Sequence, residues 1–262
     1  MAMPPAEPDR TLLILGGTTE AAQLAARLAA AYPGIAATVS LAGRTQDPRP
    51  LALPMRTGGF GGAAGLADYL AASGTRTVID ATHPFAAVMP FHADVACRAT
   101  GTALLALTRR AWQAADGDRW IGVDTMAEAA AALGKVPRRV FLTIGRQELG
   151  AFATAPHHTY LARVIDPPDG PLPPNLTLLR HRGPFDTEAE TELMRRAAID
   201  IVVAKNAGGE ATIGKVMAAR RLGLPLVMVS RPARPAVPTV ATVEEAMDWL
   251  GAHGCLPTRR GV

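Results

Sequence analysis

Short apolar runs that alternate with alanine- and leucine-rich segments constrain the fold of this chain more than any other feature. The run TLLIL at 11–15 leads into a segment with helical spacing at 19–30. Strands that are apolar throughout and separated by helices are typical of a parallel sheet covered on both faces. The sequence therefore predicts an α/β fold. The same pattern continues along the first half, with strands expected at 35–43, 76–82 and 103–108 and helices at 65–74 and 86–101.

The second half of the chain repeats the order of the first. Residues 78–133 correspond to 201–250, and residues 139–152 take the part of the opening strand, turn and helix. One such match would mean little, but several in the same order indicate two similar α/β halves. We therefore expect two domains, residues 1–115 and residues 116–262.

The charge balance excludes some classes of partner. The chain has 262 residues, a formal net charge of +4 and an aromatic content of 5%. Its arginines are scattered, with no basic helix and no aromatic-interleaved stripe, so no nucleic-acid partner is expected. A small anionic ligand fits the modest basic excess better.

The cysteines and the amino terminus bear on the compartment. Cys97 and Cys255 lie far apart in the sequence and outside any cluster with ligand spacing, so neither a disulfide nor a metal site is expected. The first residues lack the apolar core of a signal peptide, and no stretch approaches the ~20 apolar residues of a membrane helix. We expect a soluble, cytoplasmic protein with no membrane partner.

The stretch LILGGTTEA contains a glycine-rich turn between a strand and a helix. Such a turn places backbone N–H groups and the positive end of the helix dipole at one point, which favours an anion. The spacing of Gly16, Thr18 and Ala21 is a variant of the dinucleotide fingerprint. A plain tight turn is the alternative, and Glu20 is expected to cap the helix.

The next strand ends without an acidic residue. Sites that prefer NAD usually place an acid there to bind the ribose hydroxyls. Ser40 and Arg44 stand in this region instead, and they suit a 2′-phosphate, although Arg44 also fits an exposed loop. The glycines of RTGGFGG at 56–62 either bring the backbone close to a ligand or form a flexible loop.

Two polar residues lie at the carboxyl end of the strand at 76–82. Thr82 ends this strand and His83 follows it, so both emerge at the carboxyl edge, where open sheets bind ligands. A lone histidine before a proline is often structural, and a catalytic role for His83 is the alternative.

The second half carries polar clusters at equivalent strand ends. TIGRQE places Arg146 after one strand, and VVAKNAGG places Lys205, Asn206, Gly208 and Gly209 after another. A lysine with a glycine pair suits a carboxylate or phosphate, although the P-loop spacing is absent. A solvent-facing lysine is the alternative for Lys205.

Seven stretches, taken together and in order, resemble the precorrin-6A reductase family of cobalamin biosynthesis: LILGGTTEA, TGGFGG, VIDATHPFA, TIGRQ, RGPFDTEAE, VAKNAGG and VMVSRP. The resemblance covers nearly the whole chain. It implies two Rossmann-like domains with parallel sheets flanking an inter-domain cleft, the first binding NADP and the second on the substrate side. It also implies NADPH-dependent reduction of one double bond of the precorrin-6A macrocycle to give precorrin-6B. Related enzymes of the anaerobic route act on the cobalt-containing ring.

The resemblance assigns roles to the residues above. A tetrapyrrole ringed with carboxylates is the expected substrate, with transient contacts to neighbouring pathway enzymes. His83 is the candidate proton donor. An NADP-dependent reductase of a smaller substrate, a non-catalytic nucleotide-binding module and a nucleic-acid binder are the other classes. The expected cofactor residues are Gly16, Gly17, Thr18, Thr19, Glu20, Ser40, Arg44, Thr57, Gly58, Gly59 and Thr82, and the expected substrate residues are Arg146, Lys205, Asn206, Gly208 and Gly209.

Overall fold

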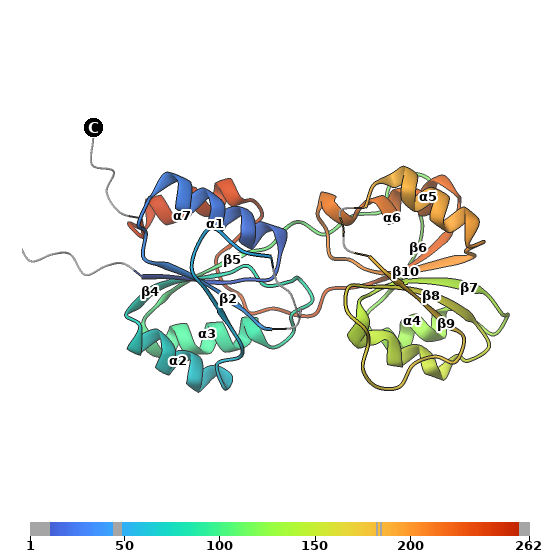
Figure 1. Cartoon of the computed structure of the whole chain (residues 1–262), viewed down its shortest axis with the longest axis horizontal. Helices are drawn as coiled ribbons and strands as arrows, with labels where there is room; N and C mark the ends of the chain where they lie inside the picture. Colours follow the sequence, from blue (N-terminus) through green and yellow to red (C-terminus); the bar gives the residue numbers. More distant parts are fainter. Residues whose placement is uncertain (1–10, 44–48, 182, 184, 257–262) are drawn as a thin grey trace, which may run out of the picture. The chain divides into compact units, whose positions relative to one another are not determined.

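The computed structural model describes residues 11–43, 49–181, 183 and 185–256. They form two compact units, shown in Figure 1. Unit 1 combines the chain up to Arg109 with the segment from Ala233 onward, and unit 2 is the continuous stretch Arg110–Pro232. The inter-domain cleft stays a prediction.

Unit 1 is a parallel sheet between two pairs of helices. Helices α1 (Thr19–Ala31) and α7 (Val243–Ala252) cover one face, and α2 (Gly62–Ala72) and α3 (Met89–Thr100) cover the other (Figure 1). The strands are β1 (Thr11–Leu15), β2 (Ala37–Leu41), β3 (Met55–Thr57), β4 (Thr75–Asp80), β5 (Ala103–Leu107) and β12 (Thr239–Val240). In the described chain their order is β12-β5-β4-β1-β2-β3, and all pairs are parallel.

Unit 2 has the same architecture. Its helices are α4 (Met126–Ala132), α5 (Thr187–Arg196) and α6 (Gly214–Arg221), with 3₁₀ segments η1 (Arg146–Thr154) and η2 (Glu210–Thr212). Its strands are β6 (Arg119–Val123), β7 (Arg139–Thr143), β8 (Thr159–Val164), β9 (Leu176–Arg180), β10 (Ile201–Lys205) and β11 (Pro225–Val229). Their order in the described residues is β6-β11-β10-β7-β8-β9, again all parallel.

By position in the fold, the strands of each sheet follow the doubly wound order 3-2-1-4-5-6. The sixth strand is β12 in unit 1 and β6 in unit 2, and in the chain each follows the fifth strand of the other unit. After β5 the chain leaves unit 1 and forms β6 and α4 in unit 2. After β11 it returns and forms β12 and α7 in unit 1. The expected domains 1–115 and 116–262 are therefore corrected: residues 110–115 belong to unit 2, and the segment from Ala233 belongs to unit 1.

The internal repeat explains this exchange. Helices α4 and α7 both begin after a threonine that caps the helix, Thr125 and Thr242. In each, a glutamate three residues later accepts a hydrogen bond from the backbone before the helix. Glu128 accepts from Asp124 N–H, and Glu245 accepts from Ala241 N–H. The two strand–helix pieces are thus equivalent, and each completes the sheet of the opposite unit.

The strands are apolar because helices cover them on both faces. In unit 1, β1 alternates Leu12 and Ile14 into one buried cluster with Leu13 and Leu15 into the other. The predicted α/β fold with parallel sheets is confirmed. No helix in the described ranges is long and apolar enough to cross a membrane.

Candidate functional site

The strand order of unit 1 reverses between β1 and β4, and their carboxyl ends form the candidate site. Open parallel sheets bind ligands outside the strand ends at such a reversal. The Gly16–Gly17 turn follows β1, and Ala81 and Thr82 follow β4. The Thr18 hydroxyl donates to Ala81 O at 2.8 Å, so one hydrogen bond joins the two segments.

The two glycines of the turn serve different physical needs. A Cβ on Gly16 would lie 2.8 Å from Val39 Cγ1, so packing against β2 requires a glycine there. Gly17 has φ +113° and no neighbouring atom within 4 Å of where a Cβ would stand. The backbone at Gly17 is therefore strained for other residues and open to an approaching group.

The turn ends in a well-formed helix start. Thr18 is the N-cap of α1, and its hydroxyl accepts from Ala21 N–H at 3.2 Å. Thr19 is the first helical residue. The positive end of the α1 dipole thus faces the open backbone of Gly17, which makes an anion cradle.

Glu20 has a different role from the one expected. Thr18, not Glu20, caps α1, and the Glu20 carboxylate accepts from Arg109 at 2.7 Å. Both side chains are largely buried, at 18% and 16% exposure. The expectation that Glu20 caps the helix is wrong, since its carboxylate instead joins the helix start to the end of β5.

At the ends of β2 and β3 the structure adds a residue that sequence analysis did not assign. Arg56 donates to Ser40 Oγ at 2.6 Å and to the carbonyls of Gly58 and Gly59, each at 3.0 Å. Its guanidinium stacks on Phe60, 3.9 Å from the ring centroid. Thr57 ends β3 and is exposed, and Gly58 has φ +113°. The glycines of this loop therefore turn their carbonyls toward a fixed arginine. Arg44 lies outside the described residues.

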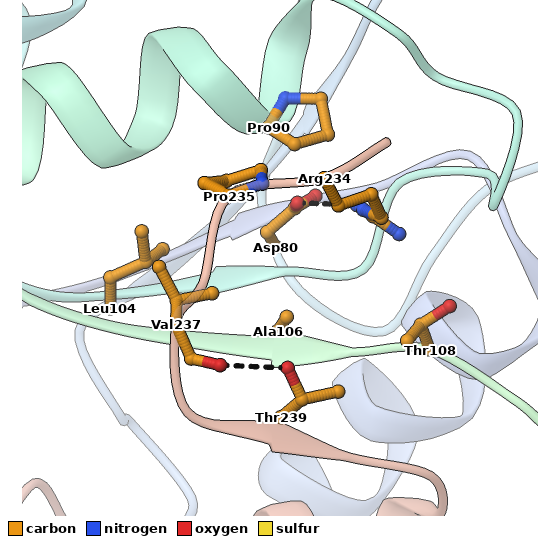
Figure 2. Close-up of a pocket in the computed structure, with 9 residues that line it drawn as sticks. All are labelled: Asp80, Pro90, Leu104, Ala106, Thr108, Arg234, Pro235, Val237 and Thr239. Carbon is orange, nitrogen blue, oxygen red and sulfur yellow. Dashed lines mark hydrogen bonds and ion pairs between the residues drawn. The ribbon is translucent and has the colours of Figure 1, made fainter. Parts of the chain in front are cut away.

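Beyond β4, Thr82 belongs to a buried polar network. Asp80 accepts from the Thr82 hydroxyl at 2.6 Å and from Arg234 at 2.6 Å, as Figure 2 shows for the ion pair. Arg234 Nε and Nη1 and Thr108 Oγ1 are buried and have no partner in the described part of the chain. Asp80, Thr108 and Arg234 line a cavity of about 30 Å³, which has room for water. The network fixes the backbone at Thr82.

His83 lies on the surface beside this network. It is exposed, and its Nδ1 accepts from Phe85 N–H at 3.2 Å. This hydrogen bond assigns the proton of the neutral ring to Nε2. The expected role of His83 in proton donation stays a prediction.

In unit 2 the two expected cations at the strand ends both have oxygen partners. Lys205 at the end of β10 forms an ion pair with Glu148 at 2.8 Å. Arg146, the first residue of η1, donates to Pro167 O at 2.9 Å and lies 3.6 Å from Asp169 Oδ2. Both cations are partly exposed, so a ligand carboxylate can reach them only in competition with these groups.

Three other expected substrate residues contact residues 110–112, the start of unit 2. The Asn206 amide accepts from Trp112 N–H at 2.8 Å and donates to Trp112 O at 3.0 Å, and Gly209 O accepts from the Trp112 indole. A Cβ on Gly208 would lie 2.0 Å from Arg110 O. These contacts give Asn206, Gly208 and Gly209 a structural role, and substrate binding by them stays a prediction.

The turn after β7 differs from its counterpart after β1. It has a single glycine, Gly145, which precedes a 3₁₀ segment with no side-chain cap. A 3₁₀ segment has poorer hydrogen-bond geometry than an α-helix, and η1 has no capped α-helical N-terminus to offer an anion. The dinucleotide-type cradle is therefore a feature of unit 1.

Sequence reasoning missed several charged residues of these networks, among them Arg56, Asp80, Arg109, Glu148 and Arg234. The sequence contains a signal for Arg56, because this residue directly precedes Thr57 and the glycine loop. Asp80 also had one, as an acid at the end of an apolar run. Arg234 had none, since its partner Asp80 is 154 residues away.

Doubly wound strand order with a glycine turn and a capped helix at the reversal defines a Rossmann-like α/β protein. The chain matches the family model described as precorrin-6x reductase CbiJ/CobK over residues 11–251. It belongs to this family of reductases and is an oxidoreductase, which implies a nicotinamide cofactor.

Individual relatives agree with the family. Precorrin-6A reductase of Rhodobacter capsulatus is 53% identical over 96% of this chain and 99% of that protein. Precorrin-6A reductase of a Sinorhizobium species is 49% identical over 94% of each. A solved structure titled CobK precorrin-6A reductase matches with a TM-score of 0.90 at 53% identity, covering 96% of this chain and 99% of that one.

Proposed function

We propose that this protein reduces precorrin-6A to precorrin-6B with NADPH, in cobalamin biosynthesis. The observation that carries the proposal is the 53% identity to a protein named precorrin-6A reductase over 96% of the chain. The two relatives described above carry no cobalt in their names, which favours the metal-free ring as substrate. A cytoplasmic location and contacts with neighbouring pathway enzymes stay predictions.

The residues of unit 1 fit a dinucleotide. The open backbone at Gly17 and the N-terminus of α1 suit the pyrophosphate, with Thr18 and Thr19 holding the turn. The ends of β2 and β3, with Ser40, Thr57, Gly58 and Gly59, suit the adenosine ribose. Bound NADPH supplies a hydride, and the protein orients it against the ring.

The substrate brings several carboxylates, and we assign part of their binding to Arg146 and Lys205 of unit 2. Both are partly exposed cations at strand ends. One substrate carboxylate then replaces Glu148 in the ion pair with Lys205, and another replaces Asp169 in the ion pair with Arg146. His83 remains our candidate proton donor, acting from Nε2 because Nδ1 accepts from Phe85.

The test is turnover with defined substrates. Purified protein is incubated with NADPH and either precorrin-6A or its cobalt complex, and the loss of NADPH absorbance is followed with the change in the corrinoid spectrum. We expect reduction of precorrin-6A and little of the cobalt complex. Turnover of the cobalt complex alone would move the protein to the anaerobic reaction, and turnover of neither would refute the proposal.

A further inference from the structure

Three arginines lie at the carboxyl edge of the unit 1 sheet, and they differ in what compensates their charge. Arg109 is paired with Glu20 at 2.7 Å, and Arg234 is paired with Asp80 at 2.6 Å. Arg56, in contrast, donates to the Ser40 hydroxyl and to two backbone carbonyls, and it has no carboxylate partner in the described ranges. Among the described residues, its positive charge is therefore held in place with no carboxylate to neutralise it.

The surroundings of Arg56 fix the guanidinium before any ligand arrives. Phe60 covers one face at 3.9 Å, and the Tyr69 ring centroid lies 5.4 Å away. The two rings support each other edge to face at 5.1 Å. A cation on aromatic rings with three hydrogen bonds loses little conformational freedom when it binds an anion.

The position of Arg56 indicates which anion. Ser40 lies in β2, paired in register with Arg56 of β3, at the edge where dinucleotide folds bind the adenosine ribose. An acid there would bind the 2′-hydroxyl of NADH, whereas an arginine accommodates a 2′-phosphate. Ser40 accepts from Arg56, so its own hydroxyl proton remains to be donated.

We infer that Arg56, fixed by Ser40 and Phe60, is the residue that selects a 2′-phosphorylated adenosine, and hence NADPH over NADH. This inference rests on the proposed NADPH function and names the group that gives its specificity. Arg44, the expected phosphate contact, lies outside the described residues, and its role stays a prediction.

The experiment compares ligands that differ only in the 2′-phosphate. NADPH and NADH, and the fragments 2′,5′-ADP and 5′-ADP, are titrated into wild type, Arg56→Ala, Arg56→Gln and the control Arg76→Ala. Arg76 is an exposed arginine near the amino end of β4, so this control removes the same charge at the opposite edge of the sheet. Arg56→Gln keeps an amide donor for the carbonyls of Gly58 and Gly59 should the alanine variant fail to fold.

We expect both Arg56 variants to lose about 10- to 100-fold affinity for NADPH and 2′,5′-ADP, and less than about twofold for NADH and 5′-ADP. Arg76→Ala should match wild type for all four ligands. Raising the salt concentration should weaken 2′,5′-ADP binding to wild type more than to Arg56→Gln. Equal losses for all four ligands, or none, would overturn the inference.

Binding of NADPH and NADH by the wild-type protein tests the proposed cofactor independently of the variants. If wild type binds neither NADPH nor NADH, the proposed function fails whatever the variants do. If wild type prefers NADPH and the Arg56 variants keep that preference, the proposed cofactor is retained. Arg56 is then not the residue that selects the 2′-phosphate.

Discussion

Arg234 donates to the buried carboxylate of Asp80 at 2.6 Å and so ties the segment that returns to unit 1 to the end of its central strand. Asp80 is 4% exposed and Arg234 16%. A carboxylate or guanidinium left alone in such a place is costly, because burial penalises a charge that has no partner.

We therefore expect Asp80→Asn or Arg234→Met to lower the free energy of unfolding of unit 1 by ~3 kcal/mol. The double variant should lose less than the sum of the two, since it leaves no unpaired charge. Urea unfolding followed by circular dichroism measures this. Additive losses would show that the pair is not coupled.

Substitution of the two glycines of the opening turn should have different effects, one on NADPH binding and the other on folding. Gly17→Val places a side chain where no atom lies within 4 Å, so the fold should survive the strain of φ +113°, about 1–3 kcal/mol. The same side chain blocks the backbone, and NADPH binding should be lost. Gly16→Val meets Val39 at 2.8 Å and should unfold unit 1. NADPH fluorescence and circular dichroism separate the outcomes, and normal binding by folded Gly17→Val would make the turn purely structural.

Glu148 should act as a competitor of the substrate at Lys205. Lys205→Met should raise KM for precorrin-6A about 10-fold with KM for NADPH unchanged, as expected for a lost charge-assisted contact. Glu148→Gln removes the competing carboxylate beside Lys205 and should lower KM for precorrin-6A. If Lys205 reaches the cofactor instead, KM for NADPH alone will rise. No change in either variant returns the pair to a structural role.

His158 should make the stability of unit 2 depend on pH. It is fully buried, and desolvation lowers its pKa below 6.5. The unfolded chain therefore binds more protons as the pH falls through ~6.5, and the contribution of His158 is present above that pH and is lost below it.

Urea unfolding between pH 7 and pH 5 should show this loss, and His158→Phe should reduce the pH slope even though Arg138 N–H loses its acceptor. His92→Phe on α3 is the control, since it changes a histidine of unit 1. An unchanged slope in His158→Phe would assign the pH dependence to other groups.

Residues 110–232 should fold as a separate fragment, whereas residues 1–109 should not. Residues 110–232 include all the strands of their described sheet. Residues 1–109 lack β12 and α7, whose Val243, Ala246 and Leu250 share a buried cluster with Leu24 and Leu28. Each large buried side chain contributes ~1.5–3 kcal/mol, so the fragment should expose an apolar face and aggregate.

Circular dichroism and size-exclusion chromatography test both fragments. Joining residues 1–109 to 233–256 through a glycine-serine linker should restore a folded unit 1. A monomeric, cooperatively unfolding fragment 1–109 would contradict the prediction.

Local features were predictable because neighbouring residues decide them. The glycine-rich turn was predicted, and Gly17 adopts a backbone angle that glycine tolerates best. The cap of α1 was predicted at Glu20 and lies at Thr18, two residues away. The correspondence of residues 78–133 with 201–250 predicted equivalent elements, and Thr125 and Thr242 cap equivalent helices. These contacts close within one turn of chain, so the order of residues specifies them.

Only the tertiary structure decided which sheet each sixth strand joins. Residues 119–123 and 239–240 follow equivalent strands, and nothing in either stretch names its partner, because a parallel strand pairs through backbone groups that all residues share. The role of Gly208 was not predictable either, because it depends on a contact distant in the chain. A Cβ at this position would lie 2.0 Å from Arg110 O, so only glycine fits. The same limit hid the arginine at the candidate 2′-phosphate site: Arg56 is fixed by Ser40, which is 16 residues away in the chain but adjacent in the sheet.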